Sequence, residues 1–337
     1  MNLEELKSQN PVDFTLAIPT YNRAKSLPNM LERLRSQINT ENFRWEILIV
    51  DNNSTDDTAK VIQAYQADWP QAYPLKYIFE PQQGAAFARQ RAIVEARSEL
   101  IGFLDDDNLP APDWVATAYS FGVEHPEVGV YDGQIHGLFE TDPPENFRKI
   151  HGCFVSEQGS KPFEYKPKER LNLPRGASFV VRKKVWLAAV PDRPALKGRV
   201  GKSMVGGEDW EVMLYIYKAG WPLWYNPHMH CYHQIPSSRL EKQYLVGLIR
   251  DAALCNCELR LILAESLPQK VTIIVRMLLG NLSKIITHFI KYRGQLKTDL
   301  IAAGQMAFLW GSFLSPLYFL KSQFEKAITP HQQEAIG

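Results

Sequence analysis

The sequence has almost no net charge. Its 337 residues include 38 Lys and Arg against 37 Asp and Glu, which leaves +1 at neutral pH. A general nucleic-acid-binding protein normally carries a clear basic excess, so this class is disfavoured. The chain is long enough for one large α/β domain, or for two smaller ones, with a well-buried core.

Cysteine is scarce and shows no metal-binding spacing. The four cysteines are Cys153, Cys231, Cys255 and Cys257. No CxxC pair occurs among them, so we expect neither a zinc site nor a disulfide framework. The first seven residues contain two acids and no apolar run, so no signal peptide is expected. Reduced thiols in a cytoplasmic protein are the simplest interpretation.

Two signatures of nucleotide binding are also missing. No GxGxxG follows the first predicted strand, so a dinucleotide-binding protein is not indicated. Gly201-Lys202-Ser203 ends like a phosphate-binding loop, but Leu196 occupies the position of the required first glycine. The resemblance to a phosphate loop is therefore attributed to chance.

Alternation of short apolar runs with helix-length segments predicts a doubly wound, mostly parallel α/β sheet. Helices are expected to begin near Ser26, at Ser54 or Thr55, and at Gly84, which opens a helix over Ala85–Ala96. The four predicted strands of this first part are Phe14–Ile18, Trp45–Val50, Leu75–Phe79 and Leu100–Leu104.

The second half of the chain changes character. Residues 136–175 are expected to form a long irregular loop or a small insertion, followed by regular structure. That structure is predicted as a strand over Ala177–Val181, a helix over Asp209–Ala219, a short strand over Trp221–Tyr225, and helices beyond about Gln243. We therefore expect an α/β domain over 1–240 and a helical extension over 241–337.

The helical extension is apolar and basic. Its longest uncharged stretch, Leu300–Leu320, is long enough to cross a bilayer, but its Gly, Gln, Ser and Pro residues favour a buried or interfacial helix. Residues 241–337 carry 11 Lys and Arg against 7 Asp and Glu, so the rest of the chain is slightly acidic. This composition suits contact with an anionic membrane surface.

Polar side chains follow three of the four predicted strands, where ligands bind in open parallel sheets. Asp51 follows the second strand, and Asp105-Asp106-Asp107 follows the fourth. Three adjacent carboxylates repel one another, and a divalent cation relieves that repulsion. A helix cap at Asp51 and a solvated acidic turn are the simpler alternatives. If the backbone is extended, Asp105 and Asp107 point one way and Asp106 the other.

The ordered motifs resemble those of family 2 inverting glycosyltransferases with the GT-A fold. The resemblance covers about residues 13 to 235; a finer one is to the glycosyltransferases of hormogonium polysaccharide biosynthesis, in the Gly102-to-Trp114 run and in Trp224-Tyr225-Asn226-Pro227. The motifs are Ile18-Pro19-Thr20-Tyr21-Asn22-Arg23, Val50-Asp51-Asn52-Asn53-Ser54-Thr55-Asp56, Gly84 through Arg89, Phe103-Leu104-Asp105-Asp106-Asp107-Asn108 and Gly206-Gly207-Glu208-Asp209, with a later His233.

The resemblance implies a role for each matching residue. Asp209 would be the catalytic base and Glu208 would orient the acceptor; Asp107, Asp105 and His233 would hold Mn²⁺ or Mg²⁺ in a DxD-type site. Arg175 and Gly176 would lie on the acceptor side. The donor nucleotide would be bound by Pro19, Tyr21, Arg23, Asp51, Arg89, Asp105 and Asp106. Helix capping at Asp209 and a structural role for His233 are the alternatives.

The implied function is transfer of a sugar from a nucleotide-diphosphate sugar to a growing, lipid-linked glycan at the inner face of the cytoplasmic membrane. A metal-dependent nucleotidyltransferase is one alternative, but it would need a glycine-rich triphosphate loop. A non-catalytic, membrane-associated nucleotide-sugar-binding protein is the other. The sequence does not identify the donor sugar, the acceptor or the linkage.

Overall fold

The computed structural model describes residues 12–328 except 170, 193, 194 and 202. The chain forms two compact units. The first comprises Met1–Asp142, Phe154–Val200 and Glu208–Pro236, and the second comprises Pro143–Cys153, Gly201–Gly207 and Ser237–Gly337.

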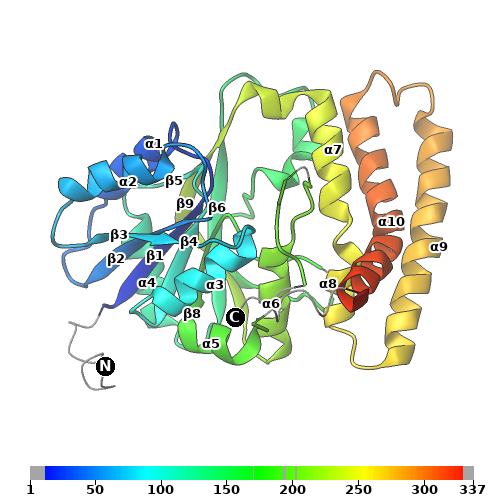
Figure 1. Ribbon diagram of the computed structural model, residues 1–337. Coiled ribbons are helices and arrows are strands. Elements are labelled where there is room, and N and C mark those ends of the chain that lie inside the picture. Colours follow the sequence, from blue (N-terminus) through cyan, green and yellow to red (C-terminus); the bar gives the residue numbers. More distant parts are fainter. Residues whose placement is uncertain (1–11, 170, 193–194, 202, 329–337) are drawn as a thin grey trace. The chain divides into compact units, whose positions relative to one another are not determined.

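A nine-stranded mixed sheet forms the centre of the first unit, in the order β3-β2-β1-β4-β8-β6-β9-β5, with β7 paired to β9 (Figure 1). β1, β2, β3, β4, β6 and β9 share one direction, and β5, β7 and β8 run against their neighbours. The strands are β1 (Phe14–Thr20), β2 (Trp45–Asp51), β3 (Leu75–Phe79), β4 (Leu100–Leu104), β5 (Asn108–Pro110), β6 (Val130–Phe139), β7 (Phe163–Glu164), β8 (Ser178–Arg182) and β9 (Leu223–Ile235).

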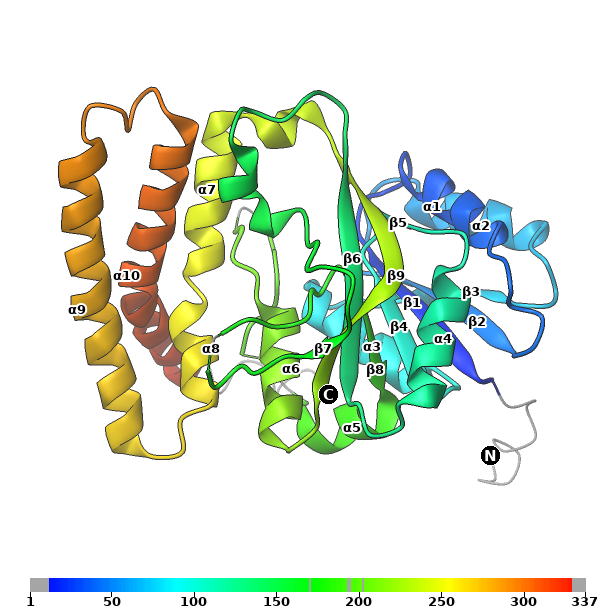
Figure 2. The same ribbon diagram turned by 180° about the vertical axis from the view of Figure 1, so that it is seen from behind.

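Helices cover both faces of this sheet (Figures 1 and 2). On one face, α1 (Leu27–Arg35), α2 (Thr58–Ala67) and α4 (Trp114–Glu124) share a core with alternate residues of β1. The other face carries α3 (Ala85–Glu95), α5 (Lys183–Ala189) and α6 (Glu208–Lys218). Because β1 lies between β2 and β4, the carboxyl ends of β1 and β4 meet at the switch point of the sheet, where ligands bind in such folds.

The predicted fold class, an α/β sheet with C-terminal helices, is confirmed. The first four strands begin at the predicted residues and end within two residues of the predicted ends, and α3 follows Gly84, whose φ of 135° an L side chain rarely adopts. The expected helix start at Ser54 or Thr55 is wrong, because α2 begins at Thr58 with Asp57 at its N-cap.

Two expectations for the second half of the first unit need correction. Residues 136–175 are partly regular: β6 continues to Phe139, and β7 lies within the segment. β9 runs for 13 residues instead of ending at Tyr225. Its length comes from pairing with β5, β6 and β7, and that pairing is a long-range property that local sequence does not reveal.

The second unit is helical. Among its described residues are three short 3-10 helices, Phe147–Lys149, His151–Cys153 and Ser237–Leu240. Four α-helices follow the last of them: α7 (Lys242–Ala253), α8 (Asn256–Ile262), α9 (Leu267–Tyr292) and α10 (Leu300–Ile328). α10 contacts α7, α8 and α9. It approaches α7 so closely that a Cβ on Gly311 would lie 2.2 Å from the carbonyl oxygen of Arg250.

By length and composition alone, α9 and α10 are both able to cross a membrane, which is weak evidence that either does. Half of the most apolar 18-residue segment of α10 is buried within the protein. Only 11 % of the corresponding segment of α9 is buried. The small residues in Leu300–Leu320 therefore serve close helix packing, whereas α9 is the more exposed of the two.

Candidate active site

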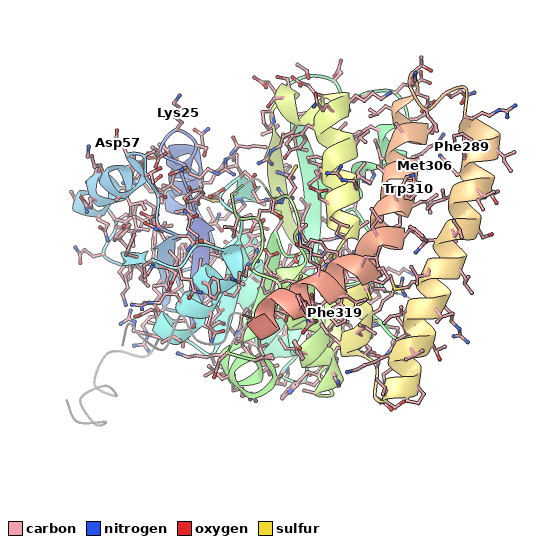
Figure 3. All side chains as sticks on the ribbon, turned by 45° about the vertical axis from the view of Figure 1, so that its right-hand side comes forward. Lys25, Asp57, Phe289, Met306, Trp310 and Phe319 are labelled. Carbon is pink, nitrogen blue, oxygen red and sulfur yellow. The ribbon has the colours of Figure 1, made fainter. Side chains whose placement is uncertain are left out.

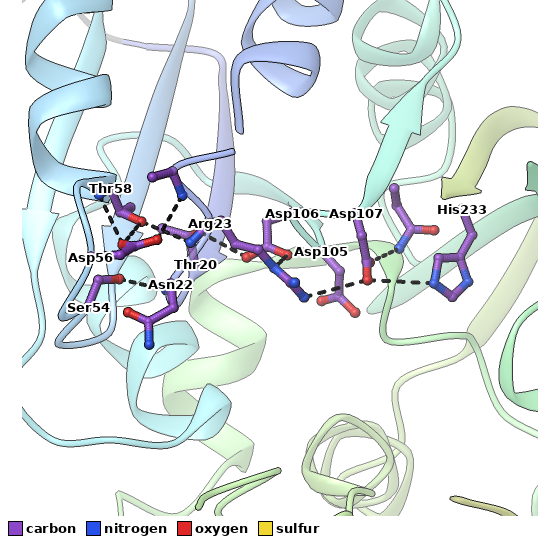
Figure 4. Close-up of polar contacts among 12 residues, drawn as sticks. Thr20, Asn22, Arg23, Ser54, Asp56, Thr58, Asp105, Asp106, Asp107 and His233 are labelled. Atoms are coloured by element: carbon purple, nitrogen blue, oxygen red, sulfur yellow. Dashed lines mark hydrogen bonds and ion pairs between the residues drawn. The ribbon is translucent and has the colours of Figure 1, made fainter. Parts of the chain in front are cut away.

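The loops after β1 and β2 are tied together by side-chain hydrogen bonds (Figure 4). The backbone N–H of Asn22 donates to Ser54 Oγ at 2.9 Å, and Asn22 Oδ1 accepts from the N–H of Thr55 at 2.8 Å. Asn22 and Asn53 have φ values of 54° and 64°, a conformation that asparagine tolerates better than most residues. Ser54 and Thr55 therefore join two strand ends instead of beginning a helix.

The middle acid of the Asp triplet braces the ends of β1 and β4. Asp106 is buried and accepts hydrogen bonds from Thr20 Oγ1 at 2.9 Å and from Arg23 Nε at 2.8 Å. Burial raises the pKa of Asp106 to about 6, although the Arg23 charge opposes that shift. Asp106 thus holds Arg23 beside the triplet, and a second guanidinium nitrogen of Arg23 lies 3.7 Å from Asp107 Oδ2.

The three acids form a turn, so the condition of an extended backbone, under which Asp105 and Asp107 would point the same way, is not met. The N–H of Asn108 donates to the carbonyl of Asp105 at 2.9 Å and closes the turn. As a result, Asp105 and Asp107 have different neighbours: Asp105 contacts Arg89, and Asp107 faces His233.

Arg89 joins the triplet to the acids that begin α6. Its guanidinium is almost completely buried and donates to Asp105 Oδ1 at 3.1 Å and to Glu208 Oε1 at 2.9 Å. Burial alone would lower the pKa of Arg89, but the nearby carboxylates, Asp209 included, outweigh it and raise that pKa. We call Arg89, Asp105, Glu208 and Asp209 the Arg89 cluster.

Asp105 remains accessible within the Arg89 cluster. The side chain is 41 % exposed, so a ligand is able to reach it. Loss of hydration and repulsion from Asp107 and Asp106 raise the pKa of Asp105 to about 6, while Arg89 opposes the shift. A bound cation would relieve this repulsion.

Asp209 lies directly against Gly176. A Cβ on Gly176 would come within 1.9 Å of Asp209 Oδ2, so only glycine fits beside this carboxylate. Partial burial raises the pKa of Asp209 to about 6; Glu208 adds to the increase, and Arg89 opposes it. The structure therefore brings together the residues predicted as base, acceptor-orienting acid and acceptor-side glycine.

Asp107 and His233 form a pair suited to a hard divalent cation. His233 Nδ1 lies 3.0 Å from the carbonyl of Phe154, which only accepts, so we assign the proton to Nδ1. His233 Nε2 then faces Asp107 Oδ2 at 3.6 Å (Figure 4). An imidazole oriented through its other nitrogen is typical of metal ligands.

Within the described ranges, no group of three or more His, Cys, Asp or Glu side chains is arranged to enclose a metal ion. Mg²⁺ and Mn²⁺ are commonly held by one or two carboxylates together with phosphate oxygens and water. The Asp107–His233 pair therefore fits a cation whose remaining ligands come from a bound diphosphate.

The other predicted donor-binding residues lie at the ends of β1 and β2. Asp51 is buried, and its two oxygens accept from the N–H of Ser54 and from Tyr77 Oη, each at 2.9 Å. Tyr21, just beyond β1, is largely exposed, and Pro19 is half-buried within that strand. Asp51 thus holds its own loop and does not cap the following helix, whose N-cap is Asp57, and the Tyr21 side chain is accessible to a ligand.

Sequence reasoning missed the buried residues that hold the backbone segments of this site in place. Asp132 on β6 is fully buried and accepts from the N–H of Arg175 at 2.7 Å and from Tyr165 Oη at 3.0 Å. It thereby fixes the segment that carries Gly176. The guanidinium of Arg175 lies over the ring of Trp210, 5.6 Å from its centre. Burial raises the pKa of Asp132 to about 7.

Glu211 plays a similar supporting part on α6. Its buried carboxylate accepts from the N–H groups of Ala195 and Leu196 at 2.8 and 2.7 Å. A Cβ on Gly84 would lie only 2.6 Å from the carbonyl oxygen of the neighbouring Lys197. The segment that Glu211 holds therefore also packs closely on the start of α3. The only sequence signal for Glu211 was its place one turn into a helix that begins with acids.

Comparison with known proteins identifies the family. The model of "Glycosyl transferase family 2" matches residues 15–184, about half of the chain. The chain therefore belongs to glycosyl transferase family 2, and it is a transferase.

Two curated relatives match shorter segments. The uncharacterized glycosyltransferase YfnE of Bacillus subtilis is 34 % identical over 102 residues, which are 30 % of this chain and 25 % of that protein. The dolichyl-phosphate beta-glucosyltransferase ALG5A of Trichomonas vaginalis is 33 % identical over 107 residues, 30 % of this chain and 32 % of that protein. The match thus spans only a quarter to a third of these relatives.

Among solved structures, the mannosyltransferase PcManGT from Pyrobaculum calidifontis, in complex with GDP-Man and Mn²⁺, superposes with a TM-score of 0.57. The sequences are 16 % identical, and the superposition covers 96 % of this chain and 92 % of that one. TarS of S. aureus reaches 0.50 at 19 % identity, over 75 % of this chain and 42 % of that one. These likenesses show the GT-A fold.

The contact between Gly176 and Asp209 makes a prediction. In Gly176→Ala the new methyl group would displace the Asp209 carboxylate, so we expect glycosyl transfer to fall about 100-fold or more, as misplacement of reacting groups by an ångström does. Steady-state kinetics would measure the loss. Gly247→Ala on α7 is the matched control, because nothing lies within 4 Å of its Cβ position. Wild-type turnover in a folded Gly176→Ala protein would contradict the placement of Asp209.

Proposed function

We propose that this family 2 transferase is an inverting, divalent-metal-dependent glycosyltransferase that uses a nucleotide-diphosphate sugar. The observation that carries the proposal is the Arg89 cluster, in which one buried cation joins the acid after β4 to the acids that begin α6. A metal-binding carboxylate turn and a candidate base are thereby linked by a single side chain. The fold shared with PcManGT, which was solved with GDP-Man and Mn²⁺, supports the choice of ligands.

The residues divide the work between donor and acceptor. Asp209, with Glu208 orienting the acceptor, would take the proton of the attacking hydroxyl as inversion proceeds. Asp107 and His233, with Asp105 beside them, would hold the metal, which when bound stabilises the departing diphosphate. Pro19, Tyr21, Arg23, Asp51, Arg89 and Asp106 would form the nucleotide side, and Arg175 and Gly176 the acceptor side.

The acceptor that we propose is a growing, lipid-linked glycan at the cytoplasmic face of a membrane, and the resemblance to the glycosyltransferases of hormogonium polysaccharide biosynthesis favours a polysaccharide. Two relatives named for lipid-phosphate sugars support a lipid-linked acceptor: the dolichyl-phosphate beta-glucosyltransferase ALG5A and an undecaprenyl-phosphate 4-deoxy-4-formamido-L-arabinose transferase of Shewanella sediminis. In this proposal residues 1–240 form the catalytic domain, and residues 241–337 the extension that contacts the membrane.

Replacing the proposed base tests the chemical step. We expect Asp209→Asn to lower turnover about 10²- to 10⁴-fold, because the amide has no basic lone pair for the acceptor proton. Donor affinity, measured by calorimetric titration, should be unchanged. Asp68→Asn, at a highly exposed position beyond α2, is the control. Turnover near the wild-type rate in Asp209→Asn would remove this residue from the base role.

The pH profile of kcat/KM tests the same group without a mutation. Only the deprotonated carboxylate accepts a proton, and partial burial together with repulsion from Glu208 raises the pKa of Asp209 to about 6. We therefore expect kcat/KM to fall at least about tenfold per pH unit below about pH 6, where Asp105 and Asp106 titrate as well. An unperturbed aspartate would sustain activity down to about pH 4. An acid limb at the lower position would show that another group acts as base.

Removing a metal ligand tests the cation site. We expect Asp107→Ala and His233→Ala each to abolish the Mn²⁺-dependent part of nucleotide-sugar binding, because each change would remove one of the few protein ligands proposed for the metal. Calorimetric titration of a panel of nucleotide sugars, with and without Mn²⁺, would measure this and would also identify the donor. Asp68→Ala should behave as wild type. Mn²⁺-dependent binding that survives both site variants would place the metal elsewhere.

A further inference from the structure

Helix α9 has one face that packs within the second unit and two faces that do not. On the packed side Ile285 is buried, and His288 Nε2 donates to the carbonyl of Ala302 on α10 at 3.0 Å. The 26-residue helix is therefore held along α10 (Figure 3). Substitutions on its outer faces leave these anchoring contacts in place.

The first outer face of α9 is a stripe of exposed apolar side chains. They recur at intervals of three or four residues, as one side of a helix requires, except for the adjacent pair Phe289 and Ile290 at the end. Their exposed fractions range from 41 % to 73 %, and Phe289 is one of them (Figure 3). The stripe consists of Leu267, Val271, Val275, Leu279, Leu282, Ile286, Phe289 and Ile290. So many contiguous apolar residues on one face mark an interaction surface.

The second outer face is polar and basic. Arg276, Lys284 and Lys291 lie there beside Thr272 and Thr287, all of them exposed. Residues 267–298 contain six Lys and Arg and no Asp or Glu. The surface that adjoins the apolar stripe is therefore positively charged along the whole helix.

This distribution argues against a transmembrane position for α9. A helix of 26 residues is about 39 Å long, so a crossing would place Arg276 and Lys284 within the hydrocarbon region, where charged side chains are costly. A helix that lies flat has no such conflict. Its apolar stripe enters the boundary of the acyl chains, and its basic residues remain among the headgroups.

We propose that α9 lies in the plane of a membrane surface and binds it through the apolar stripe and the adjoining basic face, with anionic lipid as the partner. Charge complementarity selects this partner over a neutral surface or a second copy of the chain, which would bring the basic face, Arg276, Lys284 and Lys291, near the same three charges of the other copy. The inference rests on the proposed lipid-linked acceptor and deepens it, because it assigns the contact to one helix and one orientation.

Vesicle flotation of the full-length protein tests the proposal. We expect binding to phosphatidylcholine vesicles with about 30 mol% phosphatidylglycerol, weak binding to phosphatidylcholine alone, and loss of binding as salt rises. Arg276→Gln with Lys284→Gln should weaken partitioning about 10- to 30-fold, near fivefold for each charge. Leu279→Ser with Ile286→Ser should weaken it at least as much, since both side chains are exposed apolar members of the stripe.

A matched control pairs one basic and one apolar exposed residue of α5, Lys184→Gln with Leu187→Ser, and should bind as wild type. Circular dichroism would confirm that all variants fold. Equal flotation by the wild type and both α9 double variants would overturn the proposal. So would a dimer in lipid-free light scattering that the stripe variant converts to a monomer, because the occupant would then be a second copy.

Thiol labelling tests the orientation. In a Cys153→Ser background, which removes the exposed natural thiol, we would introduce Ser266→Cys or Arg293→Cys at the two ends of α9. If the helix lies flat, an impermeant thiol reagent labels both ends of vesicle-bound protein. Protection of one end alone means that the helix crosses the bilayer, and the proposal fails.

Donor hydrolysis without acceptor separates this inference from the proposed function. Protein that hydrolyses a nucleotide sugar but does not float would refute the membrane contact alone. Protein that floats but neither hydrolyses nor transfers a sugar would refute the proposed reaction and leave the membrane contact standing.

Discussion

The candidate site depends on one buried charge, the guanidinium of Arg89. A buried cation is tolerated only when it is paired and hydrogen-bonded, and removing one partner of such a pair typically costs about 3–5 kcal/mol. Arg89 meets that requirement through Asp105 and Glu208, which lie 103 residues apart in the sequence and belong to different elements. The need to neutralise Arg89 therefore fixes where the turn after β4 and the start of α6 meet.

The remaining electrostatics follow from too many carboxylates near two cations. Arg23 is engaged by Asp106, and Arg89 by Asp105 and Glu208. Burial and mutual repulsion still raise the pKa values of Asp105, Asp106 and Asp209 to about 6 each. The free protein thus holds carboxylates whose negative charge is incompletely balanced, and a divalent cation bound at the carboxyl ends of β1 and β4 would reduce that excess.

Local sequence was sufficient where one strand determines its own environment. β1 and β4 are short apolar runs with polar residues directly after them, so their positions and the acids beyond β4 could be predicted. Local sequence was insufficient where the role of a side chain depends on a partner that is distant in the sequence. Ser54 reads as a helix cap but accepts from Asn22, 32 residues away. Asp132 reads as an ordinary strand residue, and its part in fixing Arg175 depends on a segment 43 residues later.

For the two long helices, too, hydropathy along the sequence does not predict which residues are exposed. The uncharged stretch of α10 attracts attention as a membrane span, yet its small residues allow α7 to approach, and half of it is buried. α9 contains Arg276 and Lys284 and looks less suited to lipid, yet most of its apolar residues are exposed. Packing against α10 covers only one side of α9, so both its apolar stripe and its charged residues stay exposed. For contact with lipid, the position of the charges around the helix therefore matters more than their number. The sequence shows that the C-terminal extension is basic and apolar, and the fold adds which face of which helix carries these residues.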